Sequence, residues 1–309
     1  MKKITHSIKG VLMNRRALAI TLIALPFSLL SMEKNKQQWD GNYYKKHSSH
    51  QFRAALEILD TLNVSHYKSI LDLGCGSGDV TAEIATRAPD ARVIGIDSSQ
   101  DMIKAALANH NKRTNLFFII ADAQNELPFE QRSFDLVFSS AALLWIKNKQ
   151  AVFDNLNKCL MPGGHIVLKT TRELDESHPL NLTFMKLGQN PKWQELITVF
   201  KSQPQHYPLS RDAAMKLLDQ EKWKNVTIED HRVFNTFDSK EKLAHWMMGW
   251  IGALPVMASV ENNIKEEFLN DFVNEYVTFN DTKTEQGLIL YTIPALLIKA
   301  QKYRLTTVR

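Results

Sequence analysis

Short, continuous apolar runs alternate with amphipathic stretches through residues 50–172 of the chain. Apolar runs of this length are typical of parallel strands buried on both faces, whereas apolar positions repeating at three and four residues are typical of helices. The pattern predicts helices over 52–62, 79–87 and 100–109, and strands in the runs SILDL, ARVIGIDSS, LFFIIADA, FDLVFSSAALLWI and HIVLKT. This alternation predicts an α/β fold with a doubly wound, Rossmann-like, mostly parallel sheet.

The pattern changes after residue 172. Residues 180–222 are amphipathic and helical, and two further strands, 226–237 and 287–299, flank helices near 240–251 and 261–279. We therefore expect a helical cap insertion over about residues 175–285 that covers the C-terminal edge of the sheet. An antiparallel C-terminal strand should then return to the sheet, within a single domain that spans residues 32–309.

The first predicted strand runs into the glycine-rich segment Asp72-Leu73-Gly74-Cys75-Gly76-Ser77-Gly78. Alternate glycines let the backbone turn sharply and approach a ligand closely, and the helix that follows directs its free N–H groups at that ligand. A dinucleotide fingerprint would place glycine three residues after Gly76, where this chain has Asp79. An acidic side chain there disfavours binding of a pyrophosphate but is compatible with a zwitterionic aminoacyl group. Asp72 can accept a hydrogen bond from the ammonium of such a group.

Carboxylates follow the next two strands. Asp97 lies 97 − 78 = 19 residues after the last glycine of the loop, a separation that suits bidentate acceptance from ribose hydroxyls. Asp122 ends the third strand, where it can accept from an adenine amino group, and Met102 can cover the adenine face. Helix capping is the alternative role for Asp97. The expected cofactor-binding residues are Asp72, Gly74, Gly76, Gly78, Asp97, Ser98, Met102, Asp122, Ala123 and Ser139.

Taken in order, the runs LDLGCGSG, IDSSQDMI, ADAQNELPF, FDLVFSSAALLWI and LMPGGHIVL resemble the class I S-adenosylmethionine (SAM)-dependent methyltransferases over about residues 50–172. The resemblance implies a Rossmann-like methyltransferase domain with SAM as its cofactor. More loosely, YYKKHSSHQFRAALEIL, LLWI, the segment 234–237, Trp246-Met247-Met248-Gly249 and EEFLNDFVNEY resemble the trans-aconitate methyltransferases and related small-acid carboxyl methyltransferases. The match departs at Leu144 and Phe234, where these relatives tend to carry a polar residue and tryptophan, so it does not extend to the tricarboxylate itself.

The resemblance implies methyl transfer to the carboxylate of a small organic acid, trans-aconitate-like or acyl. A carboxylate with a pKa of about 4 is already nucleophilic at neutral pH and requires no general base. Catalysis then depends on alignment with the methyl group and on exclusion of water. No residue is assigned a catalytic role; the candidates for positioning the acceptor are Tyr44, Gln51, Trp145 and Trp246, with Arg172 as a possible partner for an acid. Each has an alternative role in simple packing or at the surface.

The formal charge of +5 arises from the N-terminal leader. Residues 1–31 contain five basic residues and no acidic one, which leaves 33 basic against 33 acidic residues from Met32 onward. A neutral body gives no electrostatic footprint for nucleic acid. Two cysteines are too few for a disulfide framework, and no ligand cluster predicts a metal. We expect a monomer that binds a small carboxylic acid.

The leader combines a cationic stretch with the apolar run Ala17–Leu30, which is shorter than the roughly 20 residues needed to span a bilayer. It is signal-like or anchor-like, or translation starts at Met32. Because SAM is a cytoplasmic cofactor, we expect a cytoplasmic protein that contacts the membrane only through residues 1–31, if these are retained.

Three other functions remain open from the sequence. A quinone or lipid-precursor methyltransferase at the membrane would explain an anchoring leader. A non-catalytic SAM-binding module would keep the same fold. A nucleic-acid amine methyltransferase usually carries an Asn/Asp-Pro-Pro-aromatic stretch after the fourth strand, where this chain has Ser139-Ser140-Ala141-Ala142. The sequence argues against this last alternative.

Overall fold

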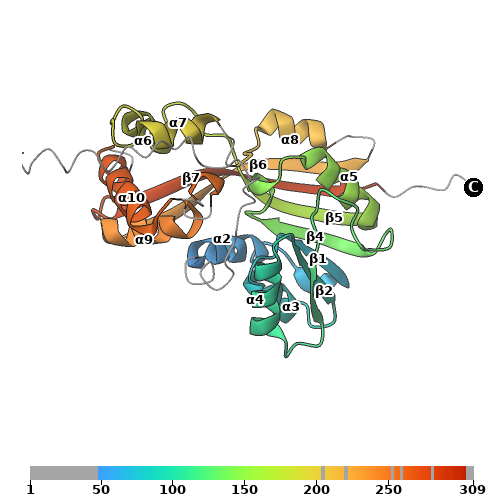
Figure 1. The fold of residues 1–309 in the computed structure, drawn as a ribbon. Helices are drawn as coiled ribbons and strands as arrows, with labels where there is room; N and C mark the ends of the chain where they lie inside the picture. The colour runs from blue at the N-terminus through green and yellow to red at the C-terminus, as the bar shows by residue number, and fades with distance from the viewer. Residues whose placement is uncertain are drawn as a thin grey trace, which may run out of the picture. The chain divides into compact units, whose positions relative to one another are not determined.

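The computed structural model describes residues 48–303, except 203–205, 219–221, 252–253, 258–259 and 280–281. The strands of this part of the chain form one seven-stranded sheet in the order β3-β2-β1-β4-β5-β7-β6 (Figure 1). The strands are β1 Ser69–Leu73, β2 Arg92–Asp97, β3 Leu116–Ile120, β4 Phe134–Ser140, β5 Leu160–Thr171, β6 Trp223–Phe237 and β7 Ile289–Lys302. The α-helices are α2 Ser49–Leu59, α3 Asp79–Arg87, α4 Gln100–His110, α5 Lys149–Cys159, α6 Pro179–Leu187, α7 Gln194–Ser202, α8 Arg211–Leu217, α9 Lys240–Ile251 and α10 Asn262–Tyr276.

The directions of the strands confirm the predicted fold class. Strands β1 to β5 pair in parallel, whereas β7 pairs antiparallel with both β5 and β6. Among the described strands, β7 is therefore the one that runs against the others. The mostly parallel, Rossmann-like sheet with an antiparallel C-terminal strand is the architecture that the apolar runs predict.

Two apolar layers hold the sheet, one on each face. Leu71 of β1 packs in a layer with α5 and α8, and its neighbour Ile70 packs in a layer with α2 and α3. Successive side chains of a strand point to opposite faces, so each interior strand contributes to both layers. This burial on both faces explains why the central strands are continuous apolar runs rather than alternating ones.

The four cap helices α6, α7, α9 and α10 lie together, with α2 between them and the central strands (Figure 1). An aromatic cluster forms their interior: Phe184 of α6 packs on Phe272 of α10 with ring centroids 4.9 Å apart, and Trp193 packs on Phe268 at 5.3 Å. The Trp193 indole Nε1 also donates to Asp271 at 2.8 Å. The cap thus has an apolar core of its own.

The predicted cap of residues 175–285 is divided in the structure. Helix α8 packs its buried Ala214 into the apolar layer shared with α5, and β6 is a strand of the sheet. Both belong to the sheet layers, so the cap consists of 179–202 and 240–276 with their connections. The periodicity of 211–217 correctly predicts a helix, but an apolar stripe does not say which apolar surface it will cover.

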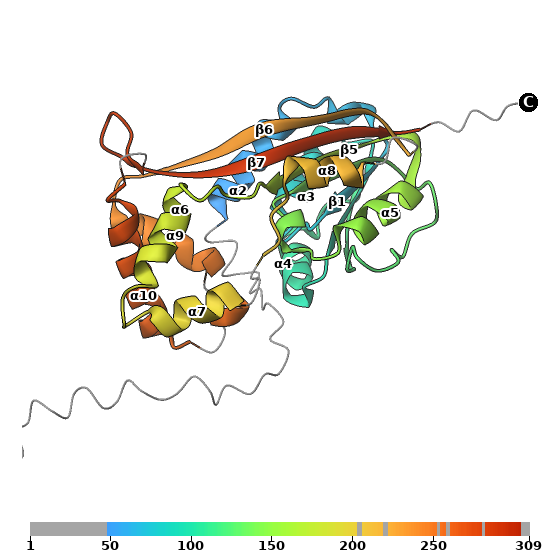
Figure 2. The same ribbon diagram turned by 90° about the horizontal axis from the view of Figure 1, so that it is seen from above.

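Strands β6 and β7 form a long hairpin that joins the sheet to the cap. They pair from Trp223↔Lys302 to Phe237↔Ile289, whereas β5 pairs with β7 only as far as Thr171↔Ala295. Residues 233–237 and 289–293 therefore extend beyond β5. Figure 2 shows this hairpin running from the sheet alongside the cap helices.

The structure contains no helix long and apolar enough to cross a membrane within the described residues. The leader 1–31 and the positioning candidate Tyr44 lie outside these residues.

Gly78 occupies the tight junction between the glycine loop and α3. Its φ is +85°, and a Cβ there would lie 2.6 Å from Phe118 Cζ and 3.0 Å from Ala106 Cβ. Gly287, before β7, has a similar φ of +78°, but its added Cβ would meet no atom within 4 Å. Alanine at Gly287 would therefore suffer backbone strain alone, whereas alanine at Gly78 would suffer both backbone strain and steric overlap.

We expect Gly287→Ala to lower the free energy of unfolding by about 1 kcal/mol, the cost of a left-handed backbone for alanine. Gly78→Ala should lower it by about 1–3 kcal/mol more, because Phe118 and α4 must also shift. Urea denaturation of both variants measures the difference. Equal losses would show that the packing around Gly78 is looser than described.

Candidate functional site

The glycine loop bends back over the end of β2. Gly74, Gly76 and Gly78 all have positive φ, and the N–H groups of Gly74 and Cys75 both donate to Ile96 O, at 2.8 and 2.9 Å. Cys75 is buried against Gly95, where a Cβ would lie 2.8 Å from Cys75 Cβ. The loop is therefore fixed on the sheet, with a backbone that a ligand can approach closely.

Asp97 connects the loop to the next helix. Its Oδ2 accepts from Gly76 N at 3.0 Å, and its Oδ1 accepts from Ser99 N at 2.9 Å. Ser99 is the N-cap residue of α4, and its side chain accepts from Met102 N. Burial raises the pKa of Asp97, while the backbone N–H donors of Ser99, Gly76 and Ser98 lower it. Each carboxylate oxygen still has a lone pair for a hydroxyl of a ligand.

Asp72 lies beneath the loop with 2% of its surface exposed. Its Oδ2 accepts from Thr81 Oγ1 of α3 at 2.7 Å. Burial raises its pKa to about 7; the Thr81 hydrogen bond opposes this shift and the Asp97 carboxylate adds to it. Two carboxylates so close together disfavour each other's ionisation, so the pair is suited to a cationic group of a ligand.

Asp122 begins a turn after β3 whose geometry leaves one carboxylate oxygen for other contacts. Its Oδ1 accepts from Gln124 N at 3.0 Å and from Gln124 Nε2 at 3.3 Å. Ala123 O accepts from the buried amide of Asn155 on α5. Asp97 and Ile120 are paired across β2 and β3, so Asp97 and Asp122 follow neighbouring strand ends. Ser98 is exposed and Met102 buried.

The side chain of Ser139 makes a hydrogen bond within the sheet. Its side chain is fully buried and Oγ donates to Leu73 O at 2.8 Å, across β4 and β1. The hydroxyl is thereby committed to joining two strands next to the glycine loop. Its predicted contact with a cofactor would have to use the backbone.

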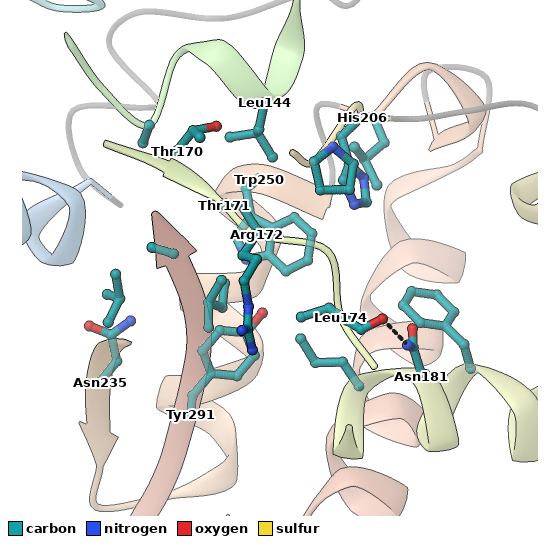
Figure 3. A pocket seen from close by; sticks show the side chains of 18 of the residues that line it. Leu144, Thr170, Thr171, Arg172, Leu174, Asn181, His206, Asn235, Trp250 and Tyr291 are labelled. Carbon is teal, nitrogen blue, oxygen red and sulfur yellow. Dashed lines mark hydrogen bonds between the residues drawn. The ribbon is translucent and has the colours of Figure 1, made fainter. Parts of the chain in front are cut away.

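A predominantly apolar cavity of about 1030 Å³ lies between the sheet and the cap (Figure 3). It contacts residues from β5, β6, β7, α2 and the cap helices, and among them are Ala54, Leu144, Leu180, Phe184, Ile197 and Ile293. Ala141, just after β4, lines it as well; its neighbour Ala142 abuts the glycine loop, because a Cβ on Gly74 would lie 2.1 Å from Ala142 Cβ. Cavity and loop therefore meet at residues 141–142. Ala141 holds a φ of +63°, a strained conformation of the kind that clusters at functional sites.

Three of the four predicted positioning residues line this one cavity. Gln51 comes from α2, Trp145 from the 3-10 helix Leu143–Trp145, and Trp246 from α9. Trp246 packs against Phe237, Trp250 and Tyr291, with ring centroids 5.5, 6.4 and 4.9 Å away. Arg172 also lines the cavity, while its Nη1 donates to Asp230 at 3.2 Å.

Polar atoms without a partner gather along the cavity wall. Among the described residues, Gln51 Oε1, Thr170 Oγ1, Arg172 Nε, Trp246 Nε1, Trp250 Nε1 and Tyr291 OH are buried with no hydrogen bond, and all six residues line the cavity. Figure 3 shows Arg172, Trp250 and Tyr291 around the same space. Native interiors leave few such groups, so their concentration here indicates a polar ligand or ordered water.

Lys169 was missed by the sequence reasoning. It lies on β5 with 4% of its surface exposed, lines the cavity, and donates to Ala54 O at 3.2 Å. Burial lowers its pKa to about 8, against the attraction of Glu57. The sequence does show a lysine inside the predicted strand His165–Thr170. A lysine in a buried strand marks a candidate functional residue, because lysine is rarely buried unless it is paired.

The described residues include no group of three or more His, Cys, Asp or Glu side chains placed to hold a metal ion.

A family model described as a methyltransferase domain matches residues 65–238, which is more than half of the chain. The chain belongs to this methyltransferase family. Its match begins before the glycine loop and ends just after β6, so it covers the loop and the part of the cavity wall that β5 and β6 form.

Similar proteins include two that are named trans-aconitate 2-methyltransferase. The trans-aconitate 2-methyltransferase of Acidovorax ebreus (strain TPSY) is 26% identical over 264 residues, which cover 85% of this chain and 98% of that protein. The trans-aconitate 2-methyltransferase of Yersinia pestis (strain Pestoides F) is 25% identical over 268 residues, covering 87% and 100%. The similarity thus extends through the cap.

Solved structures share the fold at lower identity. The YcgJ protein of Bacillus subtilis superposes with a TM-score of 0.55 at 17% identity, covering 81% of this chain and 98% of that one. Phosphoethanolamine N-methyltransferase 2 of Haemonchus contortus, solved with S-adenosylhomocysteine, gives 0.54 at 18% identity, covering 85% and 57%. The methyltransferase is of the class I, SAM-dependent type, as the sequence motifs predict.

The residues at the loop fit SAM. Its adenosyl part requires acceptors for ribose hydroxyls, and Asp97 presents two oxygens beside the loop backbone. Its aminoacyl part carries an ammonium, which suits the buried Asp72. Asp79, at the start of α3, accepts from Ser77 Oγ at 2.8 Å and lies 3.2 Å from His110 Nε2. A negative side chain there opposes a diphosphate, as the sequence indicates.

We expect Asp97→Ala to weaken binding of S-adenosylhomocysteine about 100-fold, or about 3 kcal/mol, because the ligand loses charge-assisted hydrogen bonds and Gly76 loses its partner. Asp101→Ala is the control: this residue is exposed in the first turn of α4 and pairs with Lys104 at 3.2 Å. Calorimetric titration measures both. An Asp97→Ala protein that binds as tightly as the control would remove Asp97 from the cofactor site.

Affinity for S-adenosylhomocysteine should rise between about pH 6 and pH 8. The Asp72 carboxyl has a pKa of about 7, and only its ionised form attracts the ligand's ammonium. If the ligand lowers that pKa by one unit, affinity changes about tenfold across this range. Asp72→Asn should flatten the profile.

Stability gives an independent check on Asp72. A pKa raised above its ordinary value near 4 means that the folded state holds the proton more tightly, so the contribution of Asp72 to stability is lost as pH rises from about 4 through 7. The ligand-free Asp72→Asn protein should therefore have a higher Tm than the native protein above pH 7. Identical Tm values across this range would contradict the raised pKa.

Proposed function

We propose that this SAM-dependent methyltransferase esterifies the carboxylate of an organic acid. The observation that carries the proposal is the chemical character of the unpartnered atoms around the cavity. Among the six unpartnered atoms of the described cavity residues, Gln51 Oε1 only accepts and the Thr170 and Tyr291 hydroxyls can donate or accept, whereas Arg172 Nε, Trp246 Nε1 and Trp250 Nε1 can only donate hydrogen bonds. A carboxylate, which only accepts, is their natural complement.

The reaction makes a modest demand on the protein. SAM, when bound, supplies a methyl group on a sulfonium. A carboxylate oxygen forms the new C–O bond while the S–C bond breaks and its electron pair stays on sulfur. The products are a methyl ester and S-adenosylhomocysteine, and no proton is released. The chain must therefore align the acid and exclude water, and alignment alone is worth up to about 7–11 kcal/mol. The cavity meets the glycine loop at Ala141, where the two reactants would come together.

The relatives support the same chemistry. Two trans-aconitate 2-methyltransferases match more than four-fifths of this chain, including the cap residues of the cavity. A carboxylate acceptor also agrees with the positions of Gln51, Trp145 and Trp246, none of which is a base at neutral pH.

The test is methyl transfer from labelled SAM to a panel of organic acids. We expect label that base hydrolyses, because a methyl ester is base-labile, and a kcat that stays within about twofold from pH 6 to pH 8 at saturating SAM and acid, because the carboxylate ionises near pH 4. A phenol or amine acceptor would instead give a kcat that rises with pH. Base-stable label, or no transfer to any acid, would overturn the proposal.

A further inference from the structure

The cavity has one buried cation close to the glycine loop. β5 pairs with β4 through Ser140↔Lys169, and β4 pairs with β1 through Asp72↔Phe138. Lys169 is therefore two strands from the loop and at the same end of the sheet. The backbone N–H of Ala141, where cavity and loop meet, donates to Lys169 O at 3.0 Å.

The ammonium of Lys169 has unused hydrogen-bonding capacity. It can donate three hydrogen bonds, and the described residues give it one acceptor, Ala54 O. Ser140 Oγ, from the paired position on β4, is buried and has no partner among these residues, and neither has Gln51 Oε1 on α2. Side chains paired across neighbouring strands point to the same face of the sheet, so Ser140 and Lys169 share the face that α2 covers.

Burying an unpaired ammonium is costly, and the protein tolerates it here without an ion pair. The charged groups that face Lys169 are Glu57 of α2 and His231 of β6. Glu57 is exposed, and its carboxylate lies 4.0 Å from His231 Nε2. A carboxylate in the cavity that accepts from Lys169 would give the ammonium the direct ion pair that the described residues do not supply.

The rest of the cavity has few cationic groups that could pair with a second or third carboxylate. Its other lining cations are Arg172, whose Nη1 pairs with Asp230 at 3.2 Å while its Nε has no partner among the described residues, and Lys201, which is exposed on α7. Glu176 adds a negative charge to the same wall. A tricarboxylate would place three anionic groups in a space with one uncommitted buried cation, so at least one would lie unpaired among apolar side chains.

The cavity is instead large and apolar. A volume of about 1030 Å³ is at the upper end for small-molecule sites, and its wall is built from leucine, isoleucine, phenylalanine and tryptophan side chains of the sheet and the cap. Each methylene group that an acceptor buries there contributes about 0.8 kcal/mol. An acyl chain matches this wall, whereas a compact polyacid would leave most of it uncovered.

Resting on the proposed esterification, we propose that the acceptor is a monocarboxylic acid with an extended apolar body, and that Lys169 binds its carboxylate. One carboxylate oxygen accepts from the Lys169 ammonium while the other is directed at the methyl group over residues 141–142. Lys169 is thus the specificity-determining cation of the acceptor site, and the apolar body extends between α2, β7 and the cap.

The test compares n-octanoate, n-dodecanoate and trans-aconitate on the full chain saturated with S-adenosylhomocysteine, by calorimetry, and with SAM, by turnover. We expect the affinity to increase from octanoate to dodecanoate and to be weakest for trans-aconitate. Lys169→Met should raise the Kd for dodecanoate at least tenfold, or about 1.4 kcal/mol, and leave the affinity for S-adenosylhomocysteine unchanged. Retained affinity for S-adenosylhomocysteine shows that the variant is folded.

Lys299→Met is the matched control. Lys299 lies on β7 opposite Val167, on the same face of the sheet, and pairs with Glu229 at 3.6 Å outside the cavity lining. It should leave the Kd for dodecanoate within twofold. The pH dependence adds a readout that lost packing would not change: in the native protein this Kd should rise above about pH 8, where Lys169 loses its proton, and in Lys169→Met it should stay flat.

The outcomes separate the two proposals. Tighter binding of trans-aconitate than of dodecanoate, or a Kd that Lys169→Met leaves unchanged, would overturn the monocarboxylate assignment while esterification stands. Failure to methylate any acid would overturn the esterification. The binding titration would then still decide whether Lys169 holds a carboxylate.

Discussion

The site depends on one carboxylate that accepts from two backbone N–H groups. Asp97 joins Gly76 of the glycine loop to Ser99 at the start of α4, and so fixes the spacing between these two chain segments. Because both contacts use backbone donors, they hold whatever side chains surround them. Burial raises the pKa of Asp97, and these same donors oppose part of that rise because they stabilise the ionised carboxylate in place of water.

The parts of the structure that local patterns determine could be predicted, and the parts that tertiary contacts determine could not. The apolar runs predict the five parallel strands, and the spacing from Gly78 to Asp97 predicts an acidic residue beside the glycine loop, where Asp97 accepts from Gly76 N. Periodicity could not show that α8 would pack with α5 on the sheet, because its stripe fits any apolar surface. Ser139 is predicted to bind the cofactor, yet its hydroxyl donates to Leu73 O, a contact between residues 66 positions apart. Lys169 appears in the sequence as one polar residue in a strand, and only the fold brings it beside α2.

Two buried ionisable groups of opposite sign lie on either side of the place where the glycine loop meets the cavity. Burial makes each harder to ionise: it raises the pKa of Asp72 to about 7 and lowers that of Lys169 to about 8. Each shift is a cost to the folded state at neutral pH that an oppositely charged ligand group relieves. The chain thus gives up stability at both positions, and the relief comes only when the ligands are bound. This distribution of charge favours binding of two ligands of unlike charge next to each other.

The continuity of β6 and β7 restricts how the cavity exchanges its contents. Strand β7 hydrogen-bonds to both β5 and β6 within the sheet, and residues of β6 and β7 also form the cavity wall beside the cap. Because β7 is continuous between the sheet and the cap side of the cavity, we expect this ladder to resist a hinge motion between the two. Ligands would then enter and leave by local displacement of α6 and α7, whose side chains Phe184, Met185 and Phe200 line the cavity. The strands of the cavity wall would keep their positions during this exchange.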